Sequence, residues 1–250
     1  MVNRRLYQFS LVNPYRTLTL NHIWVENRKK QWLERFMTLV EITINGRKKW
    51  AKPLREMHKL SCLDHVERLC IWADPSFTIE QFNSRRTLLA FSALNNLQEL
   101  RIERLLLSGF IPKIKLYFGH FAPTLQSLTL WRPQASCRQI LYFVGLFKEL
   151  RDLKLVNFGD RWEDEIPATL TPLSRPPLDG WLTLGNFSGE KFVVDMIALY
   201  GKLRFRSVSL WKVQHTRRVL DECADTLETL QLTLCEDCYG KNLFRWKGKG

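Results

Sequence analysis

Two groups of cysteine and histidine residues have spacings that suit metal or redox chemistry. Cys235 and Cys238 form a C-x-x-C pair, and His58, Cys62 and His65 lie close together in a segment with helical spacing. A structural zinc ion is held by four such ligands. The C-x-x-C pair has no second C-x-x-C or paired histidine nearby, and the group of His58, Cys62 and His65 lacks a fourth ligand. We therefore expect structural cysteines, with no metal ion and no cofactor.

The chain also lacks the short motifs that organise known catalytic centres. It contains no glycine-rich phosphate loop, no nucleophile-elbow motif and no H-E-x-x-H zinc-protease motif. The acidic run Glu163-Asp164-Glu165 has no neighbour suited to metal binding or acid–base catalysis. No catalytic residue is predicted, and the chain is not expected to be an enzyme.

Three of the nine tryptophans are candidates for binding rather than catalysis, because indole rings often dominate the binding energy of protein interfaces. Trp72, Trp131 and Trp211 each directly follow a triplet in which apolar residues stand at the first, fourth and sixth positions. These triplets are the elements that must position the three rings.

The apolar triplet recurs about nine times, at intervals of roughly 22 to 31 residues, a period typical of stacked repeats. The occurrences are Tyr15, Leu18, Leu20; Leu39, Ile42, Ile44; Val66, Leu69, Ile71; Leu97, Leu100, Ile102; Leu125, Leu128, Leu130; Leu150, Leu153, Leu155; Leu182, Leu184; Phe205, Val208, Leu210; and Leu227, Leu230, Leu232. In the seventh, Asp179 stands at the first position and Leu178 one residue earlier, which predicts a local bulge or shift. Residues 157–177, just before it, form the longest irregular stretch, either a solvated insertion or a lid.

Segments between the triplets have apolar residues at helical spacing, which predicts alternating strands and helices. The predicted helices are 28–38, 85–95, 138–148, 190–201 and 215–225, with Ser188 capping the fourth and Gly201 as its left-handed C-terminal residue. Strands joined through helical crossovers run parallel. The predicted fold is an α/β horseshoe, a solenoid with a parallel sheet on the concave side and helices on the convex side.

Side chains at successive strand positions point to opposite sides of a sheet, so each triplet also defines residues that face away from the core. The first outward row precedes the middle apolar residue and contains Thr17, Glu41, Arg68, Glu99, Ser127, Asp152, Trp181, Ser207 and Thr229. The second precedes the last apolar residue and contains Thr19, Thr43, Cys70, Arg101, Thr129, Lys154, Thr183, Ser209 and Gln231. Both rows are mainly polar, which supports this register because a shift of one residue would bury unpaired polar groups.

A third outward row follows the last apolar residue and contains Asn21, Asn45, Trp72, Glu103, Trp131, Val156, Gly185, Trp211 and Thr233. If the strand register continues for one more residue, the three indoles lie at one rim of the concave groove. Alternatively, the chain turns directly after the triplet and buries each indole between loops. With the first interpretation, the candidate partner-binding residues of the concave face are Trp72, Trp131, Trp211, Arg68, Arg101 and Lys154.

The composition is that of an ordinary globular protein, with 45% hydrophobic and 25% charged residues. No apolar run reaches the roughly 18 to 20 residues needed to cross a bilayer, and the N-terminus lacks the apolar stretch of a signal peptide. The six scattered cysteines fit reduced thiols better than a disulfide framework. We expect a cytoplasmic or nuclear protein that does not interact with membranes.

The formal net charge of +13 is concentrated at the two ends of the chain. Residues 1–60 carry 13 Lys and Arg against 4 Asp and Glu, residues 241–250 carry 4 against none, and residues 61–240 carry 21 of each sign. Solvated helix faces and chain ends explain this distribution. The alternative is a patch for RNA, nuclear import or an acidic partner, formed by Arg28, Lys29, Lys30, Arg47, Lys48 and Lys49. The neutral central repeats do not favour nucleic acid as the partner.

The triplets resemble those of leucine-rich repeats, whose fuller pattern is L-x-x-L-x-L-x-x-N/C. Leu227, Leu230, Leu232 and Cys235 match its cysteine form, whereas most other repeats lack the final Asn or Cys. Residues 177–184 and 203–210 are similar to the repeats of fungal F-box and leucine-rich-repeat proteins, particularly a basidiomycete group. Residues 3–9, followed by 15–20, resemble the end of an F-box leading into a first repeat. The resemblance divides the chain into an F-box remnant at 1–14, an irregular leucine-rich-repeat domain of about nine repeats at 15–240 and a basic tail at 241–250.

The resemblance implies a substrate receptor of an SCF-type ubiquitin ligase, in which the F-box recruits Skp1 and cullin and the repeats hold the protein to be modified. Skp1 is an expected partner only if upstream sequence supplies the F-box helices that are not found before Asn3. Either the gene model is truncated, or the protein is a stand-alone repeat module. The leading interpretation is a protein-binding scaffold for an unidentified protein. A nucleic-acid-associated module using the basic N-terminal repeats is the alternative, and an enzyme with an unrecognised site is the third.

Overall fold

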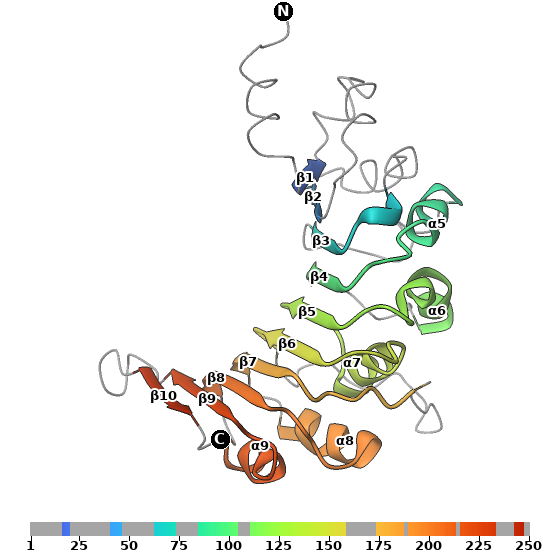
Figure 1. Cartoon of the computed structure of the whole chain (residues 1–250). Helices are drawn as coiled ribbons and strands as arrows, with labels where there is room; N and C mark the ends of the chain where they lie inside the picture. The colour runs from blue at the N-terminus through green and yellow to red at the C-terminus, as the bar shows by residue number, and fades with distance from the viewer. Residues whose placement is uncertain are drawn as a thin grey trace, which may run out of the picture.

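The computed structural model describes residues 17–20, 41–46, 63–73, 85–104, 111–158, 174–187, 190–213, 216–233 and 243–247. These residues form an α/β structure with one open sheet. Its strands are β1 (Thr17–Leu20), β2 (Glu41–Gly46), β3 (Arg68–Ala73), β4 (Glu99–Glu103), β5 (Ser127–Trp131), β6 (Asp152–Val156), β7 (Trp181–Phe187), β8 (Ser207–Val213), β9 (Thr229–Thr233) and β10 (Leu243–Lys247). The strands lie side by side in the order of the sequence, as Figure 1 shows.

All strands from β3 to β9 run parallel, and β1 and β2 extend the sheet in the same direction. At the C-terminal edge, within the segment that the sequence describes as a basic tail, Leu243–Lys247 form β10, which pairs antiparallel with β9. Its sequence, LFRWK, alternates apolar and basic residues from Phe244 onward, and charged side chains are typical of edge strands.

The apolar triplets pair in register through the sheet, as predicted. Leu69, Leu100 and Leu128 are direct neighbours on β3, β4 and β5, and the same middle position continues to Leu230 on β9. In β3 to β8 the middle and last residues of every triplet are at most 2% exposed. These two rows therefore form the apolar face of the sheet.

Helices cover this apolar face. They are α5 (Arg85–Ser92), α6 (Ile111–Phe118), α7 (Cys137–Val144), α8 (Glu190–Tyr200) and α9 (Thr216–Cys223), with the 3₁₀ turns η3 (Leu63–His65) and η4 (Gly119–Phe121). Four of them agree with helices predicted from the sequence, whereas α6 was not predicted. The predicted helix 28–38 lies outside the described residues. None of the helices in the described residues is long and apolar enough to cross a membrane.

Local sequence explains where α7 begins and where α8 ends. Ser136 caps α7, because its hydroxyl accepts a hydrogen bond from the Gln139 N–H at 3.3 Å while the Gln139 side-chain oxygen accepts one from the Ser136 N–H at 2.9 Å. Gly201 ends α8 with φ of +85°, and its N–H donates to the Ile197 carbonyl at 2.8 Å. This left-handed residue is the one expected from the sequence. The predicted cap, Ser188, lies outside the described residues.

Phenylalanine rings join neighbouring repeats beneath the helices. Phe91 of α5 lies 5.4 Å from Phe121 between ring centroids, Phe118 of α6 lies 5.0 Å from Phe143 of α7, and Phe143 lies 5.2 Å from Phe147. All five rings are buried, and these three contacts have the edge-to-face geometry that aromatic pairs prefer. The core is therefore continuous from one repeat to the next.

The seventh repeat contains the predicted bulge. Leu178 adopts a left-handed backbone with φ of +45° and is buried, so it fills the core position that Asp179 could not. Its N–H donates to the carbonyl of Leu150, the equivalent core residue of the sixth repeat, at 3.1 Å. Leucine rarely adopts positive φ, which indicates that burial of its side chain outweighs the backbone strain.

The same backbone arrangement recurs where the chain enters successive strands. Five carbonyl oxygens each accept two N–H groups from the next repeat, at 2.7 to 3.1 Å; they belong to Glu67, Gln98, Gln126, Gly180 and Arg206. Threonine side chains reinforce it, since the Thr124 hydroxyl donates to the Leu97 carbonyl at 2.9 Å and the Thr226 hydroxyl donates to the Phe205 carbonyl at 3.2 Å. The repeat in sequence is thus also a repeat in backbone hydrogen bonding.

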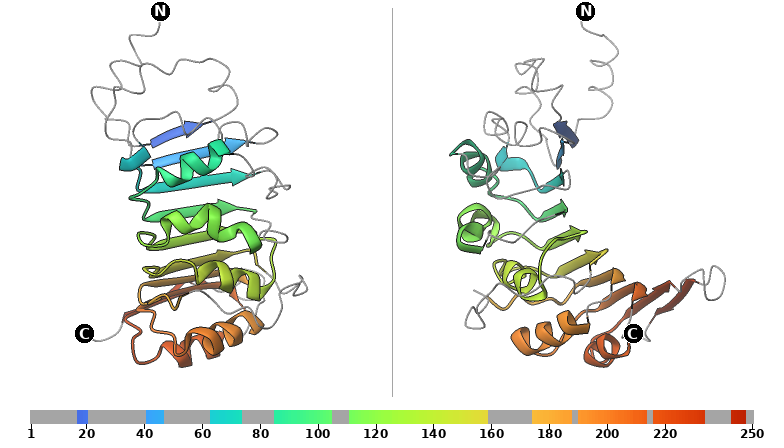
Figure 2. Two further views of the ribbon diagram at one scale, coloured as in Figure 1. Left: turned by 90° about the vertical axis from the view of Figure 1, so that its right-hand side faces the viewer. Right: turned by 180° about the vertical axis from the view of Figure 1, so that it is seen from behind.

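The described part of the sheet has one face without helices, which we call the uncovered face. Figure 2 shows all the helices on the opposite side of the strands. Figure 1 shows that the row of strands bends, with the uncovered face on the inner side of the bend. In β3 to β9 the side chains of the three outward rows belong to this face.

Candidate functional site

The outward rows remain in register across the uncovered face. In the third row, Trp72 is the direct neighbour of Glu103, Glu103 of Trp131, Gly185 of Trp211 and Trp211 of Thr233. The strand register therefore continues for one residue after each triplet in β2 to β9. Trp72 is 41% exposed, and Trp131 and Trp211 are half-buried. The alternative that the chain turns directly after the triplet and buries each indole between loops is wrong.

In β4, β5 and β6 the strand ends directly after the third row, at residues with left-handed backbone, whereas β3 and β8 continue past Trp72 and Trp211. Arg104, Arg132, Asn157 and Asn186 directly follow the third row, with φ between +46° and +58°. The N–H groups of Arg104, Arg132 and Asn157 donate to the carbonyls of the third-row residues Trp131, Val156 and Gly185, at 2.6 to 2.7 Å. These bonds continue the ladder to the rim and keep the third-row side chains on the uncovered face.

Arg101 lies between two of the predicted tryptophans. Its guanidinium carbon is 5.1 Å from the ring centroid of Trp72 and 5.6 Å from that of Trp131. β3 and β5 stand on either side of β4, two strand spacings or about 9.6 Å apart, so a planar cation fits between the two indoles. Each contact lies within the range of a cation–π interaction. The two rings therefore restrict the position of the guanidinium.

The tryptophans toward the C-terminal end are arranged differently. The Trp211 indole lies over Gly185 of the neighbouring strand, so closely that a Cβ at position 185 would come within 2.0 Å of the indole nitrogen. Trp181, in the first outward row, is 48% exposed, and its N–H donates to Oδ1 of Asp152 at 2.8 Å. Sequence reasoning placed Trp181 on this face but did not include it among the candidate binding residues. Its position in the first outward row was the available signal.

On the described part of the uncovered face, acidic side chains have polar partners, whereas two of the basic side chains do not. Glu99 lies 4.0 Å from Arg68, Glu103 lies 3.6 Å from Arg104, and an oxygen of Asp152 accepts the backbone hydrogen bond described above. Within the part of the chain that the structure describes, no hydrogen bond or ion pair engages the charged ends of Arg101 and Lys154. Glu99, Glu103 and Asp152 thus have partners, while the charged ends of Arg101 and Lys154 are available to a ligand.

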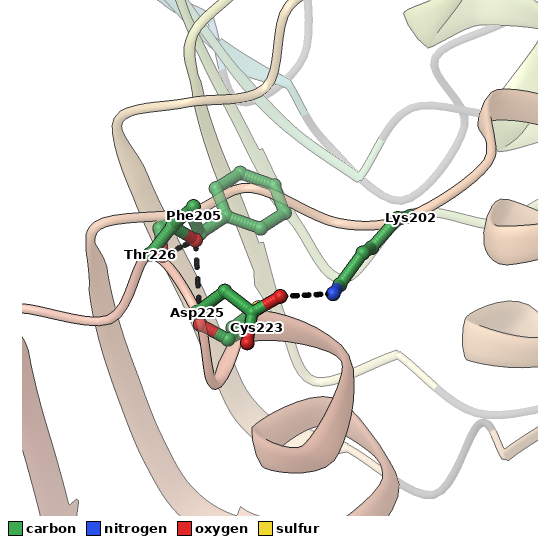
Figure 3. A network of polar contacts seen from close by, with 5 residues as sticks. All are labelled: Lys202, Phe205, Cys223, Asp225 and Thr226. Carbon is green, nitrogen blue, oxygen red and sulfur yellow. Dashed lines mark hydrogen bonds and ion pairs between the residues drawn. The ribbon is translucent and has the colours of Figure 1, made fainter.

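A second polar cluster lies at the C-terminal end of the helical layer, where Figure 3 shows Lys202, Phe205, Cys223, Asp225 and Thr226. Lys202 forms a hydrogen bond with Asp225, and this bond raises the pKa of the lysine and lowers the pKa of the carboxyl group. Burial raises the pKa of the Cys223 thiol to about 11. A protonated, buried thiol is a poor nucleophile, so this cluster connects two repeats and offers no reactive group.

Several residues considered for chemistry lie outside the described residues; they are His58, Cys62, Cys235, Cys238, the run Glu163-Asp164-Glu165 and the basic clusters around Lys29 and Lys48. His65 is described, at the end of η3, with its ring 3.8 Å from the carboxylate of Asp64. Among the described residues, no group of three or more His, Cys, Asp or Glu side chains is arranged to hold a metal ion.

The described geometry defines an α/β protein with an open, mainly parallel sheet and one uncovered face that carries aromatic and charged side chains. Comparisons with known proteins add nothing to this class, since the chain matches no family model and no curated protein or solved structure is significantly similar to it.

Proposed function

We propose that the chain is a leucine-rich-repeat solenoid, a horseshoe with a concave parallel sheet and convex helices, that binds another protein on its uncovered face. The regular recurrence of the triplet, the paired rows and the repeated backbone hydrogen bonds support this architecture. The order of the strands supports it too, because each repeat contacts mainly the repeats before and after it along the sheet.

The observation that carries the binding function is the exposure of large side chains on a face that has no role in the core. Trp72 and Trp181 are 41% and 48% exposed, and Arg101 lies against Trp72 and Trp131. Tryptophan and arginine are the residue types most enriched at the energetic centres of protein interfaces. Exposed indoles of this size cost free energy in water that a partner would recover by covering them.

The resemblance to fungal F-box and leucine-rich-repeat proteins suggests the biological setting. In such proteins the repeats hold the protein that the SCF-type ubiquitin ligase modifies. We accordingly propose that the chain is related to the substrate-recognition part of such a ligase, with Skp1 as a further partner if an F-box is joined to it.

Quantitative affinity purification with paired variants tests the binding function. The face variant carries Trp72→Ala, Arg101→Ala and Trp131→Ala, and the control variant carries Leu89→Ala and Leu116→Ala, two leucines that are about half exposed on α5 and α6. We expect a reproducible protein partner with the wild-type chain and the control variant, and its loss with the face variant, which should remain folded with a melting temperature lowered by only a few degrees. Absence of a reproducible partner, or equal recovery with all three proteins, would argue against the proposal.

A further inference from the structure

We infer that the uncovered face recognises an extended acidic segment of its protein partner, with one carboxylate on Arg101 and a second on Lys154. This inference rests on the proposed protein-binding function and specifies the chemistry of the partner. Its basis is the juxtaposition in one row of the face of two cations that form no ion pair within the described residues, the first of them held between two indole rings.

The strands that carry the two cations have a fixed separation. Arg101, Thr129 and Lys154 are direct neighbours on β4, β5 and β6 in the second outward row. Adjacent strands are about 4.8 Å apart, so the backbones that carry Arg101 and Lys154 are about 9.6 Å apart. Thr129 lies between them, is only 8% exposed and projects no long side chain. A ligand that runs across the strands can therefore reach both cations.

The state of the two cations favours an anionic ligand. A guanidinium presents a planar fork of N–H donors that matches a carboxylate with two parallel hydrogen bonds. Trp72 and Trp131 contact the Arg101 group at 5.1 and 5.6 Å, and contacts to the ring faces leave the N–H edge available. Because the rings restrict the guanidinium, little conformational entropy is lost when a carboxylate binds. Lys154 is exposed and supplies a second positive charge.

The acidic groups of the same face do not cancel this preference. Glu99 is near Arg68, Glu103 is near Arg104, and Asp152 accepts the Trp181 N–H. The first outward row and the rim thus contain engaged carboxylates, whereas the second row contains cations without an ion pair in the described part of the chain. An incoming carboxylate meets its complement along the second row.

The separation also fits an extended ligand. A polyproline II segment has three residues per turn and rises 3.1 Å per residue, so side chains three residues apart lie on the same side and about 9.3 Å apart. This matches the spacing of about 9.6 Å across two strands. On an α-helix, side chains three or four residues apart are only about 5 to 6 Å apart. Aromatic surfaces such as Trp72 and Trp131 also suit the proline rings of such a segment.

A labelled peptide provides the direct test. The probe is fluorescein-Pro-Pro-Glu-Pro-Pro-Glu-Pro-Pro-amide, titrated with the full chain and followed by fluorescence anisotropy. We expect saturable binding, at least tenfold weaker binding when both glutamates are replaced by glutamine, and several-fold weaker binding when the glutamates are two residues apart. Equal affinity for the Glu and Gln peptides would overturn the inference.

Variants of the chain assign the effect to the two cations. Arg101→Gln should weaken binding of the Glu peptide by about tenfold to a hundredfold, as expected for loss of a charge-assisted hydrogen-bonded pair. Lys154→Gln should weaken it by about threefold to tenfold. The matched control is Lys148→Gln, an exposed lysine in the loop between α7 and β6 and outside the outward rows, which should leave affinity unchanged. A control variant that weakens binding as much as Arg101→Gln would also overturn the inference.

Two further outcomes separate this inference from the function on which it rests. If a single-stranded oligouridylate binds in a manner that requires Arg101 and Lys154 while the Glu peptide does not, the site takes phosphates and the inference is wrong. If the peptide does not bind but affinity purification still recovers a partner that the face variant loses, protein binding stands and the acidic chemistry is wrong. Failure of both experiments would remove both proposals.

Discussion

The same strands build both faces of the sheet, and the two faces differ in what their side chains must do. On the face beneath the helices, the triplet residues of β3 to β8 are apolar and at most 2% exposed. On the uncovered face, the third row alone includes tryptophan, glutamate, valine and glycine in neighbouring positions, and its exposed fraction varies widely. The same strands therefore carry uniformly apolar side chains on one face and side chains of varied type on the other.

The difference teaches where to look for function. Buried rows must fill space continuously, because dense packing makes each missing methylene costly. The outward rows do not have to fill space continuously. An arginine can therefore lie between two indoles, and an indole can lie over a glycine. Substitutions on the covered face should therefore act on stability, and those on the uncovered face should act on binding.

The largest effect is expected in the phenylalanine core. Phe118 contacts Phe91, Phe121 and Phe143, with ring centroids 5.0 to 6.1 Å apart, and is fully buried. Phe118→Ala should lower the free energy of unfolding by about 3 to 5 kcal/mol, through lost burial and the cavity left behind. Urea denaturation followed by circular dichroism measures this change. A loss below about 1 kcal/mol would contradict the assignment of this ring to a shared core.

The free energy of unfolding should also depend on pH in the alkaline range, because a thiol is buried on the covered side. Burial raises the pKa of the Cys223 thiol from 9.0 to about 11, so above pH 9 the unfolded chain loses this proton while the folded chain keeps it. The free energy of unfolding should then fall with rising pH, by about 2 kcal/mol between pH 8 and pH 10.5. Burial also raises the pKa of Tyr200, which adds to the fall above pH 10.

Two variants separate these contributions in denaturation curves measured across that pH range. Cys223→Ala should flatten the decline between pH 9 and pH 10, and Tyr200→Phe should flatten it above pH 10. A decline that persists unchanged in the Cys223→Ala variant would show that this thiol does not titrate differently in the folded chain.

The covered face was the more predictable of the two because it follows from hydrophobic spacing. The triplets predicted the strands, their parallel direction and their register, and Gly201 predicted the end of α8. Helix α6 escaped prediction: its sequence, IPKIKLYF, places apolar residues on more than one side, and Leu116 is 52% exposed. β10 escaped because its short basic sequence resembles a tail and its pairing with β9 is a tertiary contact.

The uncovered face could be predicted only in part. Alternation placed the correct residues in the three rows, but whether the indoles lay on the face depended on where each chain turned. At Trp131 that point is set by the left-handed Arg132, a residue type with no special preference for positive φ. The stacking of Arg101 between two indoles depends on side-chain conformations, which no sequence spacing encodes. Residue types predicted the face, and packing determined its arrangement.

An intermediate effect on stability is expected where the uncovered face carries its largest side chains. Trp131 is half-buried and contacts Arg101 at the surface, so Trp131→Ala should lower the free energy of unfolding by about 1 kcal/mol or less. The melting temperature should change by only a few degrees while binding of the partner or the Glu peptide is lost. Differential scanning fluorimetry combined with the anisotropy assay tests both parts. Unfolding of the variant at ambient temperature would place Trp131 in the core and erase the contrast between the faces.

The smallest net effect on stability is expected at Gly185, where two contributions of opposite sign nearly cancel. An alanine Cβ would lie 2.0 Å from the Trp211 indole nitrogen, so the ring must move away from the strand. Against this strain, replacing glycine by alanine restricts the unfolded chain and stabilises the fold by about 0.4 to 1 kcal/mol. We expect Gly185→Ala to change the free energy of unfolding by less than about 1 kcal/mol, yet to shift tryptophan emission to longer wavelength as Trp211 gains solvent. The shift should disappear in a Trp211→Phe background.

Gly119→Ala is the matched control, because its nearest contact would be an ordinary 3.5 Å to the Lys115 side chain. Unchanged emission in Gly185→Ala would mean that the indole does not lie over this glycine, and the varied packing attributed to the uncovered face would lose its clearest example.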